Sequence, residues 1–441
     1  MREQMLILSA FCAVLLISVA TGFSILYALG IGLALFLFYG RRKGFSWDRL
    51  LSMMLKGVRT VSSIVLTFFF IGVLTALWRA AGTIPFIICW ASGLIHPSVF
   101  LLLVFLLCCG LSFLTGTSLG TAATMGVICA SMGRTMGVPM WLTGGAILSG
   151  AFFGDRCSPV STSALLTAKI TDTDIYGNIR NMVKTALVPF LISCALYGAV
   201  GILTPGTGAG MDVRALFSRS FTISPLALLP AAVILILSFF RVRVRTTMLV
   251  SILVSIPICL LIQRLSVRDV VFSAIRGFVP EDPEVAAVMG GGGALSMLNV
   301  GGIVLLSSAY SGLVQETGLL DGMKTWVSRT AKRAGRYTVA FMVAVASSMF
   351  SCNQTLAIML TCQLCRDLYP AGEPLALDLE DSAAIVSPMI PWCIAGAVPL
   401  ATVGATSSAL LAAFYPMLVP FWRLAGEHMA RRRSAQKTAS L

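Results

Sequence analysis

The sequence carries very little charge for its length. Of its 441 residues only 11% are charged, with 32 Lys and Arg against 18 Asp and Glu. A soluble domain carries about 25% charged residues, so the composition excludes a soluble enzyme and a disordered chain. Hydrophobic residues make up 57% of the chain, and the mean hydropathy is +0.91. The composition therefore indicates a membrane protein.

The hydrophobic runs also lack polar alternation, which a transmembrane β-barrel would require. Lipid offers no partner for backbone groups, so only helices or closed barrels span a bilayer, and a spanning helix needs about 20 apolar residues. Runs of roughly that length recur along the whole chain. We therefore expect an all-α polytopic membrane protein with about 10–13 transmembrane helices. Its surroundings would be the lipid bilayer of the cytoplasmic (inner) membrane.

Histidine is scarce, and the usual signatures of catalysis are missing. His96 and His428 belong to no cluster with metal-ligand spacing. The glycine run 290–293 is not followed by the Lys-Ser/Thr of a phosphate-binding loop. We expect neither an enzyme nor a cofactor, so any transport would be secondary and Na⁺ and H⁺ would be the coupling ions. A channel is a further, less favoured class.

The net charge of +14 comes from basic clusters that lie between apolar runs. This pattern is typical of positive-inside topology and does not indicate nucleic-acid binding. It predicts a multi-pass protein with both termini in the cytoplasm. The clusters lie at 41–43, 241–245, 324–336 and 431–433.

Four ordered sequence anchors indicate that the chain contains two related halves. They are Lys56-Gly57 with Arg276-Gly277, Gly82 with Gly318, Ser158-Pro159 with Ser387-Pro388, and the Leu-Val-Pro-Phe steps at 187–190 and 418–421. The paired anchors lie about 220 to 236 residues apart. The basic clusters place the halves in opposite orientations, which is a transporter architecture with binding at broken helices near the midplane. We predict repeats at 1–203 and 223–425, an external linker at 204–222 and a basic cytoplasmic tail at 426–441.

The first candidate site is the segment 150–163, where polar residues follow an apolar run directly. Asp155 supplies a charge, and Pro159 interrupts the helical hydrogen bonds and frees carbonyl groups. Carbonyl and hydroxyl oxygens are hard ligands that suit Na⁺. The hydroxyls belong to Ser158, Ser161, Thr162 and Ser163. Alternatively, Asp155 and Arg156 form an ion pair at a membrane interface.

The second candidate is the matching segment 380–392 in the other half. Glu380 and Asp381 precede a helix that Pro388 and Pro391 interrupt, and Ser387 adds a hydroxyl. Ionisable groups in apolar surroundings are costly, so we expect Asp381 to bind an ion or substrate. In the alternative interpretation the two carboxylates cap a helix N-terminus.

The third candidate is a pair of small polar segments that each follow an apolar span, 115–121 and 351–355. Thr117, Ser118, Asn353 and Gln354 offer oxygen atoms there. The alternative is that they make ordinary polar contacts between packed helices. For Na⁺ itself the expected ligands are Asp155, Ser158 and Thr117.

At these positions the chain resembles the NhaC family of Na⁺/H⁺ antiporters, which are inverted-repeat carriers. The resemblance covers most of the chain and is specific when its motifs are taken together. They are the segments 116–121, 150–161, Asn353-Gln354 and 380–392. The resemblance implies exchange of cytoplasmic Na⁺ for external H⁺ by alternating access. Relatives of such folds are often homodimers, so a homodimer is a further expectation.

Two positions depart from the family pattern. The family has Ser-Asp-Thr where this chain has Ser161-Thr162-Ser163, and Asn where it has Cys393. The first departure removes a carboxylate and leaves Asp155 and Asp381 as the chief candidates for charge exchange. The main hypothesis is that Asp155 binds Na⁺ or H⁺ in competition. The alternative is a Na⁺- or H⁺-coupled transporter or exchanger of organic acids or amino acids.

Overall fold

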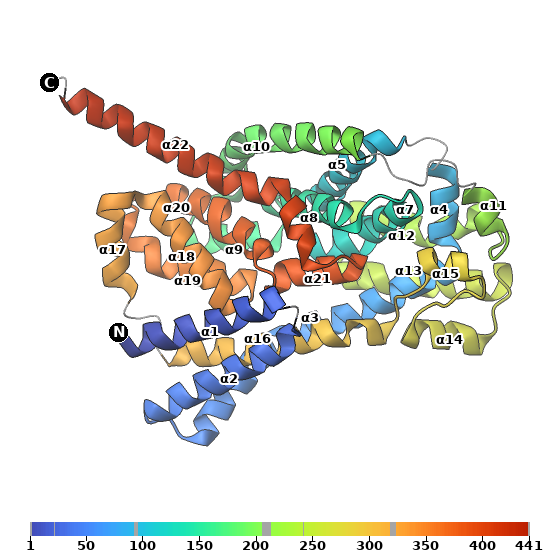
Figure 1. The fold of residues 1–441 in the computed structure, drawn as a ribbon, viewed down its shortest axis with the longest axis horizontal. Coiled ribbons are helices and arrows are strands. Elements are labelled where there is room, and N and C mark those ends of the chain that lie inside the picture. The colour runs from blue at the N-terminus through green and yellow to red at the C-terminus, as the bar shows by residue number, and fades with distance from the viewer. Residues whose placement is uncertain are drawn as a thin grey trace.

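The computed structural model describes residues 2–21, 23–91, 96–204, 213–240, 242–317 and 323–439. Throughout these ranges the ordered elements are helices, and the β-structure is a single isolated bridge between Phe278 and Gly291. Most of the long helices run along the long axis of the molecule (Figure 1). The predicted all-α fold is confirmed.

The helices of the first half are mostly long, and several stop at breaks within predicted spans. They are α1 (Arg2–Thr21), α2 (Ile25–Arg42), α3 (Trp47–Ala80), α4 (Thr83–Ala91), α5 (Pro97–Thr115), α6 (Ser118–Thr121), α7 (Val127–Thr135), α8 (Met140–Cys157), α9 (Thr162–Thr171) and α10 (Ile175–Leu203). A π-helical segment, Ala122–Gly126, joins α6 to α7.

The second half continues in the same manner. Its helices are α11 (Val213–Ser218), α12 (Leu229–Phe239), α13 (Val244–Pro257), α14 (Val267–Arg276), α15 (Pro283–Met289), α16 (Leu298–Glu316), α17 (Met323–Ala334), α18 (Arg336–Ser351), α19 (Gln354–Cys365), α20 (Gly372–Leu379), α21 (Ile394–Val403) and α22 (Phe414–Ala439). Two further π-helical segments follow, Ile258–Ile262 after α13 and Glu380–Ala384, which continues α20. The predicted tail from 426 onward continues α22 as far as Ala439.

Five helical segments in the described ranges are long and apolar enough to cross a membrane. Two helix pairs that are bent at short breaks bring this number to seven: Val65–Ala80 with Thr83–Trp90, bent by 61°, and Gly372–Met389 with Ile394–Val403, bent by 48°. Large apolar side chains such as Leu203 and Phe239 are exposed, as lipid-facing positions would be. A polytopic membrane protein is confirmed, while the count of 10–13 spans stays a prediction.

The long helices α3 and α16 cross closely through glycines. A Cβ atom at Gly57 would collide with the backbone of α16, and one at Gly312 would collide with the backbone of α3. Further along, the N–H of Gly293 donates to the carbonyl of Gly72 at 2.7 Å. These contacts pair residues in opposite chain order, so the two helices run antiparallel. That is the relation we expect if α3 and α16 belong to inverted repeats.

Two helix breaks in different halves have the same geometry. Helix α5 ends at Gly116 with φ +62°, and Thr117 then caps α6 in an extended conformation. Helix α18 ends at Cys352 with φ +52°, and Asn353 caps α19 in the same way. The breaks have the spacing of the predicted anchors Gly82 and Gly318, although Gly318 lies outside the described residues. They support two repeats, whose boundaries stay a prediction.

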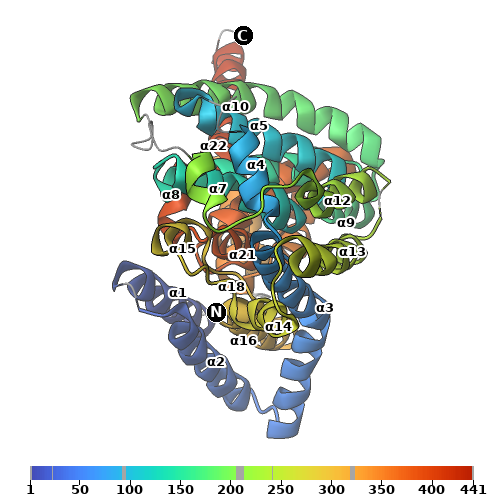
Figure 2. The same cartoon turned by 90° about the vertical axis from the view of Figure 1, so that its right-hand side faces the viewer.

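The broken helices lie between two outer layers. Figure 2 shows α1, α2 and α16 along one edge, α10 along the opposite edge, and α8, α9 and α21 between them. Both termini and α17 lie at one end of the molecule, and α11 lies at the other (Figure 1). Part of the predicted linker, 205–212, is outside the described residues, and α11 lies in its described part.

Candidate functional site

Asp155 lies near the end of α8 and is only 4% exposed. The Ser161 hydroxyl donates to its Oδ1 at 3.1 Å, and the Ser163 hydroxyl donates to its Oδ2 at 3.4 Å. The backbone of Ser118 and the side chain of Gln354 also lie within hydrogen-bonding reach of the carboxylate. These groups come from the first turns of three helices, α9, α6 and α19. The structure therefore gathers donors from both halves around one buried carboxylate.

The break between α8 and α9 follows from local sequence signals. Ser158 leaves the helix in an extended conformation, and Ser161 caps α9 by accepting from the N–H groups of Ser163 and Ala164. Pro159 lies between them and cannot continue the helical hydrogen bonds. The Ser158 hydroxyl donates to the carbonyl of Phe113 at 2.6 Å, which fastens the break to α5.

In each of the two polar segments 115–121 and 351–355, one predicted residue caps a helix and the next one lies near Asp155. Thr117 accepts from Gly120 N at 3.3 Å, and Asn353 accepts from Leu356 N at 3.3 Å. Each cap is followed at once by a residue that faces Asp155, namely Ser118 or Gln354. Thr117 and Ser158, both expected as Na⁺ ligands, hold backbone groups in this conformation.

The sharp turn after α5 depends on glycine, which gives a testable prediction. Gly116 has φ +62°, and a Cβ there would lie 2.7 Å from the N of Ser161. We expect Gly116→Ala to destabilise the protein by about 1–2 kcal/mol from backbone strain alone, with displacement of Ser161 adding to it. Thermal unfolding of the purified protein would measure this.

The matched control for that prediction is Gly110→Ala on the same helix. A Cβ at Gly110 would meet nothing within 4 Å. Its unfolding temperature should stay at the wild-type value or rise slightly, because alanine favours the helix. Equal stability of both variants would contradict the role given to Gly116.

Asp381 is completely buried and engages two arginines. Its Oδ1 contacts the guanidinium of Arg156, which is itself 1% exposed, and its Oδ2 lies 2.8 Å from Arg423 Nε. Thr185 also donates to Oδ1 at 3.2 Å. Arg156 thus pairs with Asp381 from the other half of the chain, and the interfacial Asp155–Arg156 pair considered as an alternative is not formed. The charge of Asp381 is neutralised by these cations.

Glu380 has different surroundings from its neighbour Asp381. It is fully buried in the π-helical segment, and neither carboxyl oxygen has a hydrogen-bond partner within the described residues. Because α20 begins at Gly372, Glu380 and Asp381 lie in the interior of the helix. The alternative that they cap a helix N-terminus is therefore wrong. In the sequence Glu380 is recognisable only as a carboxylate before a helix break, because no local pattern reveals which partners a buried group lacks.

The remaining predicted residues lie apart from the Asp155 cluster or have other contacts. Thr162 is the first residue of α9 and is exposed. The Ser387 hydroxyl donates to the Ala383 carbonyl at 2.6 Å and contacts the Ser348 hydroxyl at 3.0 Å. Pro388 is the second residue of the 3₁₀ turn Ser387–Met389, and Pro391 lies in the irregular segment before α21.

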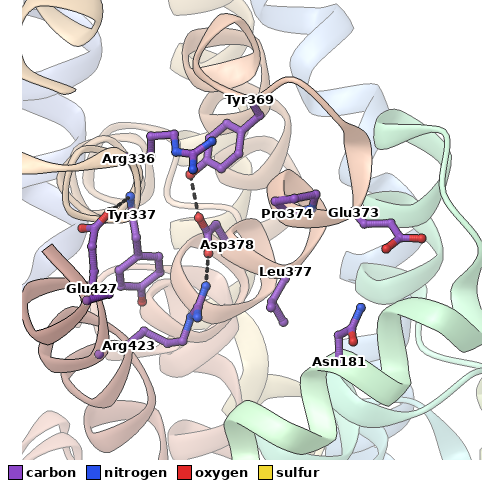
Figure 3. Close-up of a pocket in the computed structure, with 12 residues that line it drawn as sticks. Asn181, Arg336, Tyr337, Tyr369, Glu373, Pro374, Leu377, Asp378, Arg423 and Glu427 are labelled. Carbon is purple, nitrogen blue, oxygen red and sulfur yellow. Dashed lines mark hydrogen bonds and ion pairs between the residues drawn. The ribbon is translucent and has the colours of Figure 1, made fainter. Parts of the chain in front are cut away.

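A cavity of about 490 Å³ lies among α10, α18, α20 and α22, close to the end that holds the termini. Figure 3 shows Tyr369 and Arg423 directed at Asp378 from two sides. The Tyr369 hydroxyl donates to Asp378 at 2.7 Å, and Arg423 contacts both Asp378 and Asp381. A continuous chain of charged contacts therefore leads from this cavity to the buried Asp381.

Comparison with known proteins places the chain among transporters. The family model described as the Na⁺/H⁺ antiporter family matches residues 4–171 and 150–419. The malate-2H⁺/Na⁺-lactate antiporter of Bacillus subtilis (strain 168) is 27% identical over 88% of this chain and 86% of its own. The Na⁺/H⁺ antiporter NhaC of Alkalihalophilus pseudofirmus is 27% identical over 87% and 85%.

A third relative is the arginine/ornithine antiporter ArcD of Halobacterium salinarum, 27% identical over 82% of this chain and 77% of its own. The two family matches together span both predicted halves and include every polar segment described above. The resemblance to NhaC is thus confirmed, and the chain belongs to the Na⁺/H⁺ antiporter family.

Proposed function

We propose that this chain exchanges Na⁺ for H⁺ across the cytoplasmic membrane and that Asp155 binds the two ions in competition. The observation that carries this proposal is the buried Asp155 carboxylate with hydroxyls of Ser161 and Ser163 at 3.1 and 3.4 Å. Oxygen-rich surroundings suit a hard cation such as Na⁺. The same carboxylate can carry a proton when the cation leaves. Competition at one carboxylate would couple the two fluxes without ATP.

The helix breaks support alternating access around this site. Asp155 lies where α6, α9 and α19 all begin, and these helices come from both halves of the chain. Broken helices at a repeat interface allow one part to rock against the other about a fixed site. We propose that such rocking exposes Asp155 first to one face of the membrane and then to the other.

The orientation is proposed from charge. Both termini lie at the same end of the molecule as the basic helix α17 (Figure 1). Cytoplasmic loops carry an excess of Lys and Arg, so we assign this end to the cytoplasm. The proposed function requires a bilayer and small ions and calls for no cofactor, while the homodimer stays a prediction.

The test is a flux assay on purified protein in liposomes that contain a pH-sensitive dye. The interior of the liposomes is first made acidic. Na⁺ added outside should then dissipate the proton gradient in a saturable manner, because Na⁺ enters as protons leave. K⁺ or choline at equal ionic strength should not. If proton movement is independent of Na⁺, the proposal fails.

Exchange of organic acids or amino acids is the second candidate. Three helix N-termini meet at one point, and such termini favour anionic groups, including a substrate carboxylate. Thr162 also replaces the acidic residue of the family pattern. A thermal-shift screen separates the candidates. Stabilisation by malate, lactate or arginine without Na⁺ would favour this alternative, and a ligand at 100 times its Kd stabilises by about 2.7 kcal/mol.

A further inference from the structure

Glu380 is an unusual buried carboxyl group because it forms no ion pair with any described residue. Its side chain is 0% exposed, and both carboxyl oxygens are without hydrogen-bond partners among the described residues. The side chain of Thr167 on α9 lies within hydrogen-bonding reach of its carboxyl group. The Thr167 hydroxyl is likewise fully buried and has no other partner in the described part of the chain.

This environment favours the protonated carboxyl. An ionised carboxylate needs several donors or a counter-ion when it is removed from water, whereas Glu380 faces the single hydroxyl of Thr167 and forms no ion pair among the described residues. A protonated carboxyl is neutral and can donate one hydrogen bond, which the free lone pairs of Thr167 can accept. The geometry therefore fits a carboxyl group that holds a proton in this conformation.

The charges of neighbouring side chains, including that of Asp155, act on Glu380 electrostatically. Arg156 is within electrostatic range but is already engaged by Asp381, whereas Asp155 and Asp381 both repel a negative charge on Glu380. The helices packed against this segment carry further titratable groups, of which the buried or half-buried ones beside Asp381 are Asp378 on α20, Tyr337 on α18, and Tyr415 and Arg423 on α22. Others on these helices are Lys169 on α9, Lys184 on α10, Arg336 on α18, Cys362 and Cys365 on α19, Glu373 on α20, and Glu427 and His428 on α22. Of these, Arg423 and Asp378 pair with each other, so neither supplies a free charge to Glu380.

We propose that Glu380 carries a second transported proton and releases it when a cation neutralises Asp155. This inference rests on the proposed Na⁺/H⁺ exchange and extends it to two protons for each Na⁺. Binding of Na⁺ removes the negative charge of Asp155, which makes ionisation of Glu380 less costly. The O–H bond then breaks, and the proton passes to water on the side from which Na⁺ entered. By linkage, protonation of Glu380 weakens Na⁺ binding by the same factor.

The decisive variant is Glu380→Gln, which resembles the protonated side chain and cannot release a proton. In liposomes, the H⁺/Na⁺ ratio obtained from the gradients at zero net flux should fall from about two to about one. An imposed membrane potential should then accelerate wild-type exchange and leave the variant unaffected. Glu373→Gln removes an exposed carboxylate on the same helix, α20, and should behave as the wild type.

Infrared spectroscopy gives a readout that does not depend on flux. The spectrum of the wild type at neutral pH should contain a protonated-carboxyl band that is absent from Glu380→Gln and shifted in Glu380→Asp. Absence of this band overturns the inference, whatever the cargo and even if Glu380→Gln is inactive. An unchanged ratio in an active Glu380→Gln protein overturns it as well. A wild type that moves no protons with Na⁺ would instead contradict the proposed function.

Discussion

Asp155→Asn is expected to reduce Na⁺-driven proton exchange by about a hundredfold or more, because it removes the ionisable group on which coupling depends. The neutral amide can neither bind a proton nor compensate the charge of a bound cation. Its Oδ1 can still accept from Ser161, and Ser163 can accept from its Nδ2, so the fold should be kept. Initial rates of Na⁺-dependent pH change in liposomes measure the effect.

The control for this experiment is Asp172→Asn. Asp172 is an exposed carboxylate at the end of α9 with φ +55°, a conformation that asparagine also adopts readily. Its exchange rate should equal that of the wild type. Rapid Na⁺-driven exchange by a well-folded Asp155→Asn protein would place the cargo site elsewhere and remove the basis of the proposed function.

The helix breaks could be predicted because their causes are local. Pro159 and Pro388 remove backbone donors, and serine next to a proline is well suited to end one helix or begin another. The correspondence between Gly116 at the first break and Cys352 at the second is harder to predict, because the two residue types differ. Only the matching positive φ values reveal that these residues occupy equivalent places.

The partners of the carboxylates could not be predicted, because they depend on tertiary packing. Arg156 and Asp381 are 225 residues apart in sequence, and no local pattern brings them together. From the sequence alone Asp381 is the stronger candidate, but the structure places Arg156 and Arg423 against it, whereas its neighbour Glu380 forms no ion pair among the described residues. The two carboxylates are adjacent in the sequence, yet the charge of Asp381 is neutralised by arginines and Glu380 has no such counter-ion among the described residues.

The structure also shows where Thr162, which departs from the family pattern, lies relative to Asp155. The resemblance to the family implies that an aspartate at position 162 would belong to the cation site. Thr162 is exposed at the first turn of α9, whereas Ser161 and Ser163 on either side of it contact Asp155. In this conformation an acidic side chain at position 162 would lie outside the cluster. The substitution therefore leaves the oxygen ligands around Asp155 intact.

Arg156→Met is expected to lower the free energy of unfolding by about 3–5 kcal/mol, because it leaves Asp381 buried with one of its two cations removed. Asp381→Leu should be destabilising for the converse reason, since the fully buried Arg156 loses its counter-ion. Equilibrium unfolding of the purified variants in detergent would provide these values. Arg219→Met breaks the exposed pair with Glu284 and should change stability by less than about 1 kcal/mol.

The double variant Arg156→Met/Asp381→Leu separates the ion pair from its two components. Replacing both partners of a buried pair with apolar groups is often neutral, because the cost of desolvating both charges disappears with their attraction. Arg423 keeps its contact with Asp378 in this variant. The double variant should therefore be more stable than either Arg156→Met or Asp381→Leu alone, so the coupling energy should exceed the larger of the two single losses. Additive losses would mean that Arg156 and Asp381 act independently, and the charged chain from the cavity to Asp381 would then have no energetic basis.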